Sequence, residues 1–323
     1  MNNVCFKIAV ALIAGIGLFS TSASAANRTV DCNEGQSIQD AVEKGQGSAS
    51  QLYIDVSGSC EEVVTIKRDD VTIDGGETAT VVGTILVDGG RRISIRDITI
   101  TGPGPGVGAA SSSLELRSVV ITGNSGVGVI AVESAHAGIF KSTISNNDQG
   151  GVLAREGSNV IVGKTSINGH DGEGIFLIND STGTINNSTI SGNSPGIFAL
   201  LNSSLMVSNS HIDNNNGSGI EVDNGGSVFV DDNTTINGNA GHGVSAGLHS
   251  SVEIGDPVAI TNNDAFGIKL ETDSGVRIRS GVTISGSGDV GVFCEDTESS
   301  FLSHSPIDDG VECTDFNQVA PPL

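Results

Sequence analysis

Isoleucine recurs at a nearly constant interval along most of the chain. Successive positions lie 22 to 24 residues apart, and each ends a short apolar stretch that precedes an Asn- and Gly-rich turn: Ile98, Ile121, Ile144, Ile167, Ile190, Ile212, Ile236, Ile260 and Ile284. A fixed period of this length is typical of a solenoid, in which one structural unit is copied and stacked. We therefore expect a repeat protein rather than a domain with one central core.

Each turn is followed by a Gly and then by alternating residues. The segment 219–223, which reads Gly-Ile-Glu-Val-Asp, is one example. Alternation with a period of two predicts a β-strand with one buried face. The first and third residues after the Gly form two aliphatic columns, which fill a narrow interior when strands stack at about 4.8 Å per rung.

Three short strands per unit of roughly 23 residues predict an all-β protein, a single-stranded right-handed parallel β-helix of about ten coils. We expect this β-helix over residues 61–300, an N-terminal cap over 26–60, and a C-terminal tail over 301–323 that breaks the repeat and caps the open end. Residues 37–44 are the expected α-helix of the N-terminal cap, because Ser37 is a favourable N-cap residue.

A mostly asparagine column lies three residues after the repeated isoleucines: Asn124, Asn147, His170, Asn193, Asn215, Asn239, Asn263 and Ser287. Amides stacked at one turn can hydrogen-bond to their equivalents in neighbouring coils. His170 interrupts the column and is followed by Asp171 and Glu173. We expect it in a solvent-exposed loop rather than in a metal site, because ligands from adjacent residues rarely complete a coordination shell.

Composition and charge limit the classes of molecule that this protein can bind. The chain has 45 Gly and only 10 Phe, 1 Tyr and no Trp, which agrees with an interior of stacked aliphatic residues. Its 15 Lys and Arg face 38 Asp and Glu, giving a formal net charge of −23. Such a charge repels the phosphates of a nucleic acid and an anionic membrane surface, so nucleic acid is excluded as a partner.

The N-terminus reads as a cleaved secretory signal peptide over residues 1–25. Lys7 precedes an apolar run over 8–19, and Ala23-Ser24-Ala25 supplies the small residues of a cleavage site. The apolar run is too short for a span of about 20 residues, and no later segment comes closer. We expect a secreted or periplasmic protein with no membrane span.

Four cysteines remain after the expected cleavage, and they suggest two disulfides. They are Cys32, Cys60, Cys294 and Cys313. Three pairings are possible, and we favour the two local ones, each of which would staple one end of the fold. A metal site is the alternative, but no C-x-x-C motif or Cys/His cluster accompanies these residues.

The outward residues of the strands after each Gly change character along the chain. The first four rungs from Gly128 are mainly apolar and define an apolar stripe: Ile130, Val132, Leu153, Arg155, Phe176, Ile178, Phe198 and Leu200. A patch of this size is normally covered. Either the C-terminal tail or a turn folds over it, or it mediates self-association or partner binding, or it contacts a ligand through Arg155, Phe176 and Phe198.

The next rungs carry charge: Glu221 and Asp223, then Ser245 and Gly247, then Lys269 and Glu271. Residues two apart on a strand face lie about 7 Å apart, so Glu221 and Asp223 could act as general acid and base. Ser245 and Gly247 would leave a hollow beside them. The alternative is that these are solvated strand residues that form ordinary surface ion pairs.

The segments CNEGQSIQDAVEKG and LYIDVSGSCEEVVTIKRDDVTIDGG and the repeated G-I-x-V…T-I-x-x-N pattern resemble the pectate-lyase-like β-helix superfamily over nearly the whole mature chain. This resemblance implies polysaccharide as the partner, along the outer face of those strands. It also implies that Ca²⁺, held by Glu221, Asp223 and Glu271, neutralises a uronate carboxylate. Lys269 would then be the catalytic base, with Arg155 as a more distant candidate.

A second, local resemblance involves the motifs Gly241-His242-Gly243 and Arg277-Ile278-Arg279, which are similar to motifs of polygalacturonases. It implies that His242 and Arg277 line one sugar subsite. The paired catalytic aspartates that should accompany them are replaced by Ser218 and Gly219. Because G-x-G occurs in many rungs, the repeat by itself explains the first motif.

Two functions follow. The first is an exported β-helix that associates with polysaccharide along its outer strand face, with lyase- or epimerase-like chemistry at Glu221, Asp223, Lys269 and Glu271. The second is a non-catalytic adhesin, envelope or partner-binding repeat protein that uses the apolar stripe. A prior question is whether the stripe is bare or covered.

Overall fold

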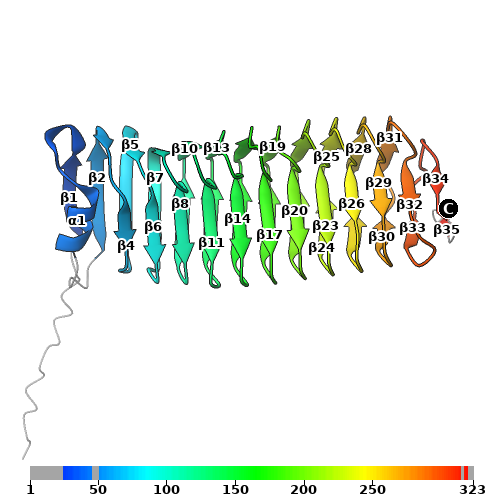
Figure 1. Cartoon of the computed structure of the whole chain (residues 1–323), viewed down its shortest axis with the longest axis horizontal. Helices are drawn as coiled ribbons and strands as arrows, with labels where there is room; N and C mark the ends of the chain where they lie inside the picture. Colours follow the sequence, from blue (N-terminus) through cyan, green and yellow to red (C-terminus); the bar gives the residue numbers. More distant parts are fainter. Residues whose placement is uncertain (1–24, 46–50, 314–315, 319–323) are drawn as a thin grey trace, which may run out of the picture.

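The chain forms one long right-handed parallel β-helix. The computed structural model describes residues 25–45, 51–313 and 316–318; the predicted signal peptide lies outside these residues, apart from Ala25. The coils stack along a single axis from the N-terminal to the C-terminal end (Figure 1). All paired strands run parallel, in two sheets of 12 and 23 strands.

The smaller sheet, which we call sheet B, contains the strands that follow the repeated Gly. Its strands are β4 (Val64–Ile66), β6 (Ile85–Asp88), β8 (Val107–Ala110), β11 (Val129–Val132), β14 (Val152–Arg155), β17 (Ile175–Ile178), β20 (Ile197–Leu200), β23 (Ile220–Asp223), β26 (Val244–Ala246), β29 (Ile268–Leu270), β32 (Val292–Cys294) and β34 (Val311–Glu312). Its 12 strands give about two coils more than the expected ten.

The larger sheet, sheet A, contains two rows of strands. The first row is β1 (Ala26–Asp31), β2 (Leu52–Ser57), β5 (Val71–Val82), β7 (Ile93–Gly102), β9 (Ser113–Arg117), β12 (His136–Phe140), β15 (Asn159–Gly163), β18 (Thr182–Asn186), β21 (Ser204–Ser208), β24 (Ser227–Asp231), β27 (Ser251–Ile254), β30 (Gly275–Ile278), β33 (Ser300–Ser303) and β35 (Phe316–Gln318). The second row is β3 (Ser59–Cys60), β10 (Val120–Asn124), β13 (Thr143–Ser145), β16 (Ser166–Asn168), β19 (Thr189–Ser191), β22 (His211–Asp213), β25 (Thr234–Asn237), β28 (Val258–Thr261) and β31 (Thr283–Ser285).

The predicted inward columns form the core. Ile175 and Ile220 are fully buried, as are Leu177 and the repeated Ile121. The second and fourth residues of each sheet B strand face outward and are partly exposed, for example in β17 and β23. The period-two prediction therefore places side chains on the correct side of the sheet.

Both ends of the coil extend past the expected bounds of 61–300. At the N-terminal end, β1 already pairs in parallel with β2. At the C-terminal end, β33 pairs in register with β30, and Phe301 is buried beside Val276. The described residues 300–303 thus continue the repeat instead of breaking it, because they supply another buried rung.

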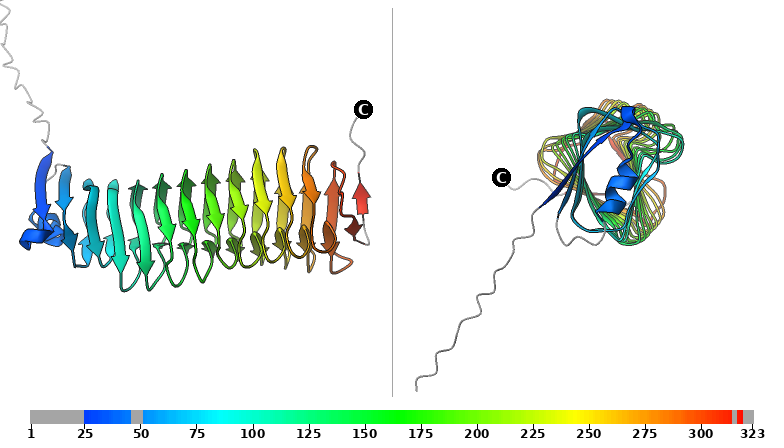
Figure 2. Two further views of the ribbon diagram at one scale, coloured as in Figure 1. Left: turned by 90° about the horizontal axis from the view of Figure 1, so that it is seen from above. Right: turned by 90° about the vertical axis from the view of Figure 1, so that its left-hand side faces the viewer.

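The predicted helix and disulfides close the ends. The helix α1 spans Ile38–Lys44, and its N-cap Ser37 accepts a hydrogen bond from the Asp40 backbone N–H. In Figure 2, α1 lies across the open N-terminal end of the coil. Disulfides join Cys32 to Cys60 and Cys294 to Cys313, as the local pairing predicted: one at each end of the fold.

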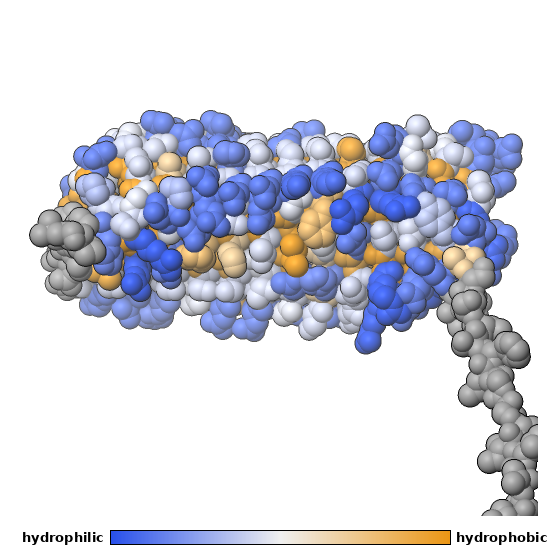
Figure 3. All heavy atoms as spheres, turned by 180° about the vertical axis from the view of Figure 1, so that it is seen from behind, coloured by the Kyte–Doolittle hydropathy of each residue, from blue (hydrophilic) through white to orange (hydrophobic). Residues whose placement is uncertain are grey.

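The disulfides favour export to an oxidising compartment. Within the described part of the chain, no helix is long and apolar enough to cross a membrane. On the face seen from behind, hydrophobic side chains reach the surface in a band along the long axis, bordered by hydrophilic ones (Figure 3).

The asparagine ladder is present, and His170 belongs to it. Asn193 Nδ2 donates to Ile167 O over 3.2 Å, and Asn193 Oδ1 accepts from the His170 backbone N–H over 3.2 Å. The expectation of a solvent-exposed His170 is wrong, because its side chain is fully buried at the equivalent position. Its ring takes over the roles of the asparagine amide.

Candidate functional site

The predicted charged residues gather in one hollow on the outer face of sheet B. The hollow has a volume of about 370 Å³ and is lined by Phe198, Gly217, Ser218, Glu221, Val222, Asp223, Gly241, His242, Ser245, Gly247, Lys269 and Glu271. It spans β20, β23, β26 and β29, which are consecutive rungs. We call it the sheet B hollow.

The small residue Gly247 keeps the middle of the hollow open. A Cβ atom at this position would lie 3.2 Å from Asp223 Oδ1 and 3.7 Å from Glu271 Oε2. The two carboxylates therefore face each other across Gly247 from strands two rungs apart. Any side chain here would push into the space between them.

Lys269 is held in place by carboxylates. Its ammonium group contacts Glu271 and lies 3.0 Å from Glu295 Oε2. Burial opposes the charged form, but the hydrogen bonds to Glu271 and Glu295 outweigh it and raise the pKa of Lys269. A lysine kept protonated in this way does not suit the predicted role of catalytic base.

Glu221 is the carboxylic acid best placed for proton transfer. Burial raises its pKa, and the nearby charges of Glu173, Asp223 and Glu271 act in the same direction, while a hydrogen bond with Ser218 opposes them. Glu221 therefore stays protonated to a higher pH than an ordinary glutamate. This property is common to carboxyl groups that act as general acids.

His242 also lines the hollow and is neutral at physiological pH. Burial lowers its pKa, and the charge of Lys269 lowers it further. Its Nδ1 atom accepts a hydrogen bond from the Phe266 backbone N–H over 3.3 Å, so the neutral ring carries its proton on Nε2. That N–H is a donor for a ligand oxygen.

Aromatic rings continue on both sides of the hollow. His242 stacks on Phe266 with ring centroids 5.3 Å apart, and Phe266 stacks on Phe293 at 4.5 Å. On the other side, Phe198 stacks on Phe176 at 5.3 Å. The candidates Phe176 and Phe198 thus extend the wall.

Sequence reasoning missed Phe266, Phe293 and Glu295 as neighbours of the hollow. Phe293 and Glu295 occupy the same outward columns as Lys269 and Glu271, one rung further on, so the repeat contained that signal. Phe266 precedes the repeated Gly, as His242 does, at a column that the strand pattern does not cover.

Arg155 lies outside the hollow. Its half-exposed side chain is 3.7 Å from Glu156, and it ends a strand three rungs before β23. The apolar stripe from Ile130 to Leu200 has no cover within the described tail, because β33 and β35 extend sheet A and β34 extends sheet B. The described tail therefore does not cover the stripe, and the apolar side chains of the stripe are partly exposed.

The predicted calcium ligands Glu221, Asp223 and Glu271 do not bring three ligand atoms within 4.8 Å of one another. A Ca²⁺ site needs several oxygen ligands around one point. In the described chain, three potential ligand atoms converge within 4.8 Å only at Cys32, Cys60 and Glu62, and both cysteines are disulfide-bonded. The carboxylates of Glu221, Asp223 and Glu271 do not converge in this way, and Lys269 already supplies a positive charge to Glu271.

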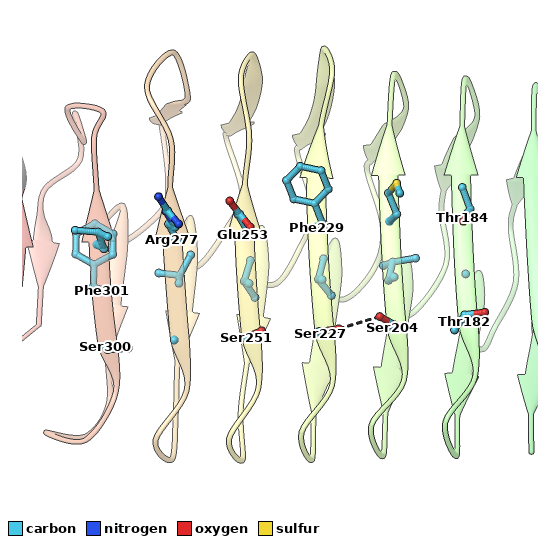
Figure 4. Close-up of a pocket in the computed structure, with 18 residues that line it drawn as sticks. Thr182, Thr184, Ser204, Ser227, Phe229, Ser251, Glu253, Arg277, Ser300 and Phe301 are labelled. Carbon is cyan, nitrogen blue, oxygen red and sulfur yellow. Dashed lines mark hydrogen bonds between the residues drawn. The ribbon is translucent and has the colours of Figure 1, made fainter. Parts of the chain in front are cut away.

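A second, larger groove lies on the outer face of sheet A. It has a volume of about 840 Å³ and crosses β18, β21, β24, β27, β30 and β33 (Figure 4). Arg277 lines this groove, whereas His242 lines the sheet B hollow. The single subsite implied by the polygalacturonase-like motifs is therefore not assembled.

The fold and the sheet B hollow define the class: a right-handed parallel β-helix with an acidic, ring-walled depression on its outer strand face. Consistent with this, residues 83–235 match the family model described as right handed beta helix region. No curated protein matches the sequence.

Solved structures share the fold at low sequence identity. The A-module of mannuronan C-5 epimerase AlgE6 from Azotobacter vinelandii superposes with a TM-score of 0.72 and 16% identity, over 88% of this chain and 95% of that chain. The A-module of AlgE4 from the same organism gives 0.52 and 15%, over 88% and 93%. The active domain of bacteriophage CBA120 tailspike protein 2 gives 0.54 and 11%, over 82% and 44%.

Proposed function

We propose that this β-helix binds polysaccharide in the sheet B hollow. The observation that carries the proposal is that the rings of Phe198 and His242 and the acidic side chains of Glu221, Asp223 and Glu271 line one hollow. Phe198 and His242 offer flat faces to a sugar ring, and Glu221 and Asp223 offer acceptors to its hydroxyls. Two structural neighbours are named as epimerases of mannuronan, a polysaccharide, and this likeness gives further support.

Charge selects the kind of sugar. Around the hollow, the four acidic residues Glu221, Asp223, Glu271 and Glu295 face one ammonium, that of Lys269, and the whole chain has a formal charge of −23. This field opposes an anionic sugar. We therefore propose that the bound segment is neutral or carries an amino group.

A second candidate function is acid–base modification of the bound sugar. The raised pKa of Glu221 favours it, because a protonated carboxyl beside the carboxylate of Asp223 can donate a proton to a leaving oxygen. Neither the lyase-like nor the epimerase-like chemistry that the resemblance implies can use Lys269 as the base in this arrangement. Glu221→Gln would abolish turnover and spare binding.

Filling the hollow tests the binding function. Gly247→Leu places a side chain between Asp223 and Glu271 and should weaken binding of neutral or amino-sugar oligosaccharides at least about tenfold, because losing about 1.4 kcal/mol of site contact has that effect. The readout is titration calorimetry after an array has identified the glycan. We expect the same affinity with and without Ca²⁺.

The matched control is Ala110→Leu. Ala110 occupies the same outward column near the N-terminal end of sheet B, far from the hollow. The Ala110→Leu variant should bind the glycan as tightly as the unmodified protein. The proposal fails if the array detects no glycan, or if both variants bind the selected glycan as tightly as the unmodified protein.

The partly exposed apolar stripe supports a different candidate, self-association or capture of a protein partner through Phe176 and Phe198. If this function operates, the unmodified protein sediments as an oligomer and the double variant Phe176→Asp, Phe198→Asp sediments as a monomer with unchanged circular dichroism. A monomeric unmodified protein at all accessible concentrations would leave the stripe without a role in self-association.

A further inference from the structure

The sheet A groove lies between two rows of outward side chains (Figure 4). One row is almost entirely hydroxyls: Thr182, Ser204, Ser227, Ser251 and Ser300. Two of them, Ser204 and Ser227, lie 2.9 Å apart through their Oγ atoms. The other row contains Thr184, Met206, Phe229, Glu253, Arg277 and Leu302. The groove thus combines hydrogen-bonding groups on one side with a cation and the partly exposed ring of Phe229 on the other, and the Arg279 guanidinium lies 5.3 Å from the centroid of that ring.

The groove continues into a neighbouring hollow toward the N-terminus. That hollow has a volume of about 390 Å³ and shares Thr184 with the sheet A groove. Its lining includes Arg117, Lys141 and Lys164. Within the two depressions, the rung of Lys141 (β12) and the rung of Arg277 (β30) are six steps of about 4.8 Å apart, or about 29 Å.

Within the residues that the structure describes, cationic side chains without an ion-pair partner lie toward both ends of the path that the two depressions form: Arg277 at one end, and Lys141 and Lys164 at the other. The only carboxylate lining the sheet A groove among the described residues, that of Glu253, is bound by Arg279 through contacts of 2.8 Å from Nε and 2.6 Å from Nη2. Within the same part of the chain, no ion pair or side-chain hydrogen bond engages Arg277, Lys141 or Lys164. The cations therefore face solvent in a protein whose formal charge is −23.

Lys141 and Lys164 carry like charges in adjacent coils. Lys141 and Lys164 hold equivalent turn positions with φ of 52° and 54°, and the Lys141 backbone N–H donates to Gly163 O of the next coil. Like charges one rung apart are unfavourable unless an anion lies between or above them. This local excess of positive charge points to an anionic ligand.

The dimensions favour a glycan over a peptide. The two rows are two residues apart along each strand, so the groove is about 7 Å wide, the width of one extended chain. Its hydroxyls repeat at about 4.8 Å, whereas an extended peptide advances about 3.3 Å per residue and would fall out of register. The rung spacing is close to the advance per sugar of an extended pyranose chain.

We propose that this path binds a linear anionic glycan, in which acidic groups contact Arg277 at one end and Lys141 and Lys164 at the other. The hydroxyl row would hydrogen-bond to sugar oxygens, and Phe229 would contact one sugar face. The site goes beyond the sheet B hollow, because it lies on the other sheet and has the opposite charge.

The test compares a uronate hexasaccharide with its neutral counterpart, cellohexaose, by titration calorimetry. The unmodified protein should bind the uronate more tightly and lose affinity as salt rises, since salt screens charge contacts. Arg277→Ala and the pair Lys141→Ala, Lys164→Ala should each weaken uronate binding at least about tenfold, with Arg277→Lys intermediate.

Arg92→Ala is the charge-matched control, because Arg92 lies near the N-terminal end and pairs with Asp70. It should leave uronate affinity unchanged. Gly247→Leu should do so too, which separates this path from the sheet B hollow. The proposal is overturned if no uronate binds, if cellohexaose binds equally well in the same groove, or if Arg92→Ala weakens binding as much as Arg277→Ala.

Discussion

His170 shows how a single side chain adapts to a repeat. Its Nδ1 atom accepts from the Asn147 backbone N–H over 3.0 Å, and its Nε2 atom lies 3.2 Å from Ile144 O. Neighbouring asparagines make the same two contacts through Oδ1 and Nδ2. The imidazole must therefore be neutral, with its proton on Nε2, to replace the amide.

This burial makes the stability of the fold sensitive to acid. Desolvation lowers the pKa of His170, so the unfolded chain binds the proton more readily than the folded one. The contribution of His170 to the free energy of unfolding is complete above the unfolded pKa of about 6.5. It is lost as the pH falls from that value toward the lower folded pKa, by up to about 1.4 kcal/mol per pH unit.

We predict that His170→Asn removes part of this dependence. The variant completes the asparagine ladder with a side chain that does not titrate. Urea unfolding at pH 7.5 and pH 5 measures it: the free energy of unfolding should fall less in the variant than in the unmodified protein. Equal losses in the two proteins would contradict the proposed titration of His170.

Within each coil, the Gly before a sheet B strand is fixed by packing against the next coil. At Gly219, an added Cβ atom would lie 2.6 Å from Ile236 Cγ2 and 2.8 Å from Gly243 O. The second atom belongs to the backbone and cannot move independently. The Gly column therefore reflects close approach of neighbouring coils.

Gly219→Ala should accordingly destabilise the fold by about 1–3 kcal/mol, the usual cost of overpacking. Gly108→Ala is the control, because its Cβ would meet only Leu86 Cδ2, at 2.8 Å, the mobile end of a side chain. Denaturant unfolding measures both. A loss of stability at Gly108 as large as at Gly219 would refute the packing explanation.

The same coil geometry decides what the sequence can predict. The columns assign inward and outward positions correctly, so the sequence alone places Glu221, Asp223 and Lys269 on one face. It does not predict the ion pairs of Lys269 or the burial of His170, because these depend on side-chain conformations across coils. The sheet A groove is also not predicted from the sequence, because the repeated Gly that identifies the sheet B strands does not precede the strands of sheet A.

For the whole molecule, the coil provides a rigid support on which two faces differ in charge. The sheet B hollow is rich in carboxylates, whereas the path along sheet A carries unpaired cations at both ends. The helix α1 covers the N-terminal end of the coil, which protects that strand edge from pairing with other chains, and one disulfide staples each end.

The most direct test of the central claim is a crystal structure of the mature chain with a bound neutral or amino-sugar oligosaccharide. We predict a sugar ring in the sheet B hollow between Phe198 and His242, with hydroxyls on the carboxylates of Glu221 and Asp223. Sugar density on any other face, with the hollow occupied only by solvent, would contradict the claim.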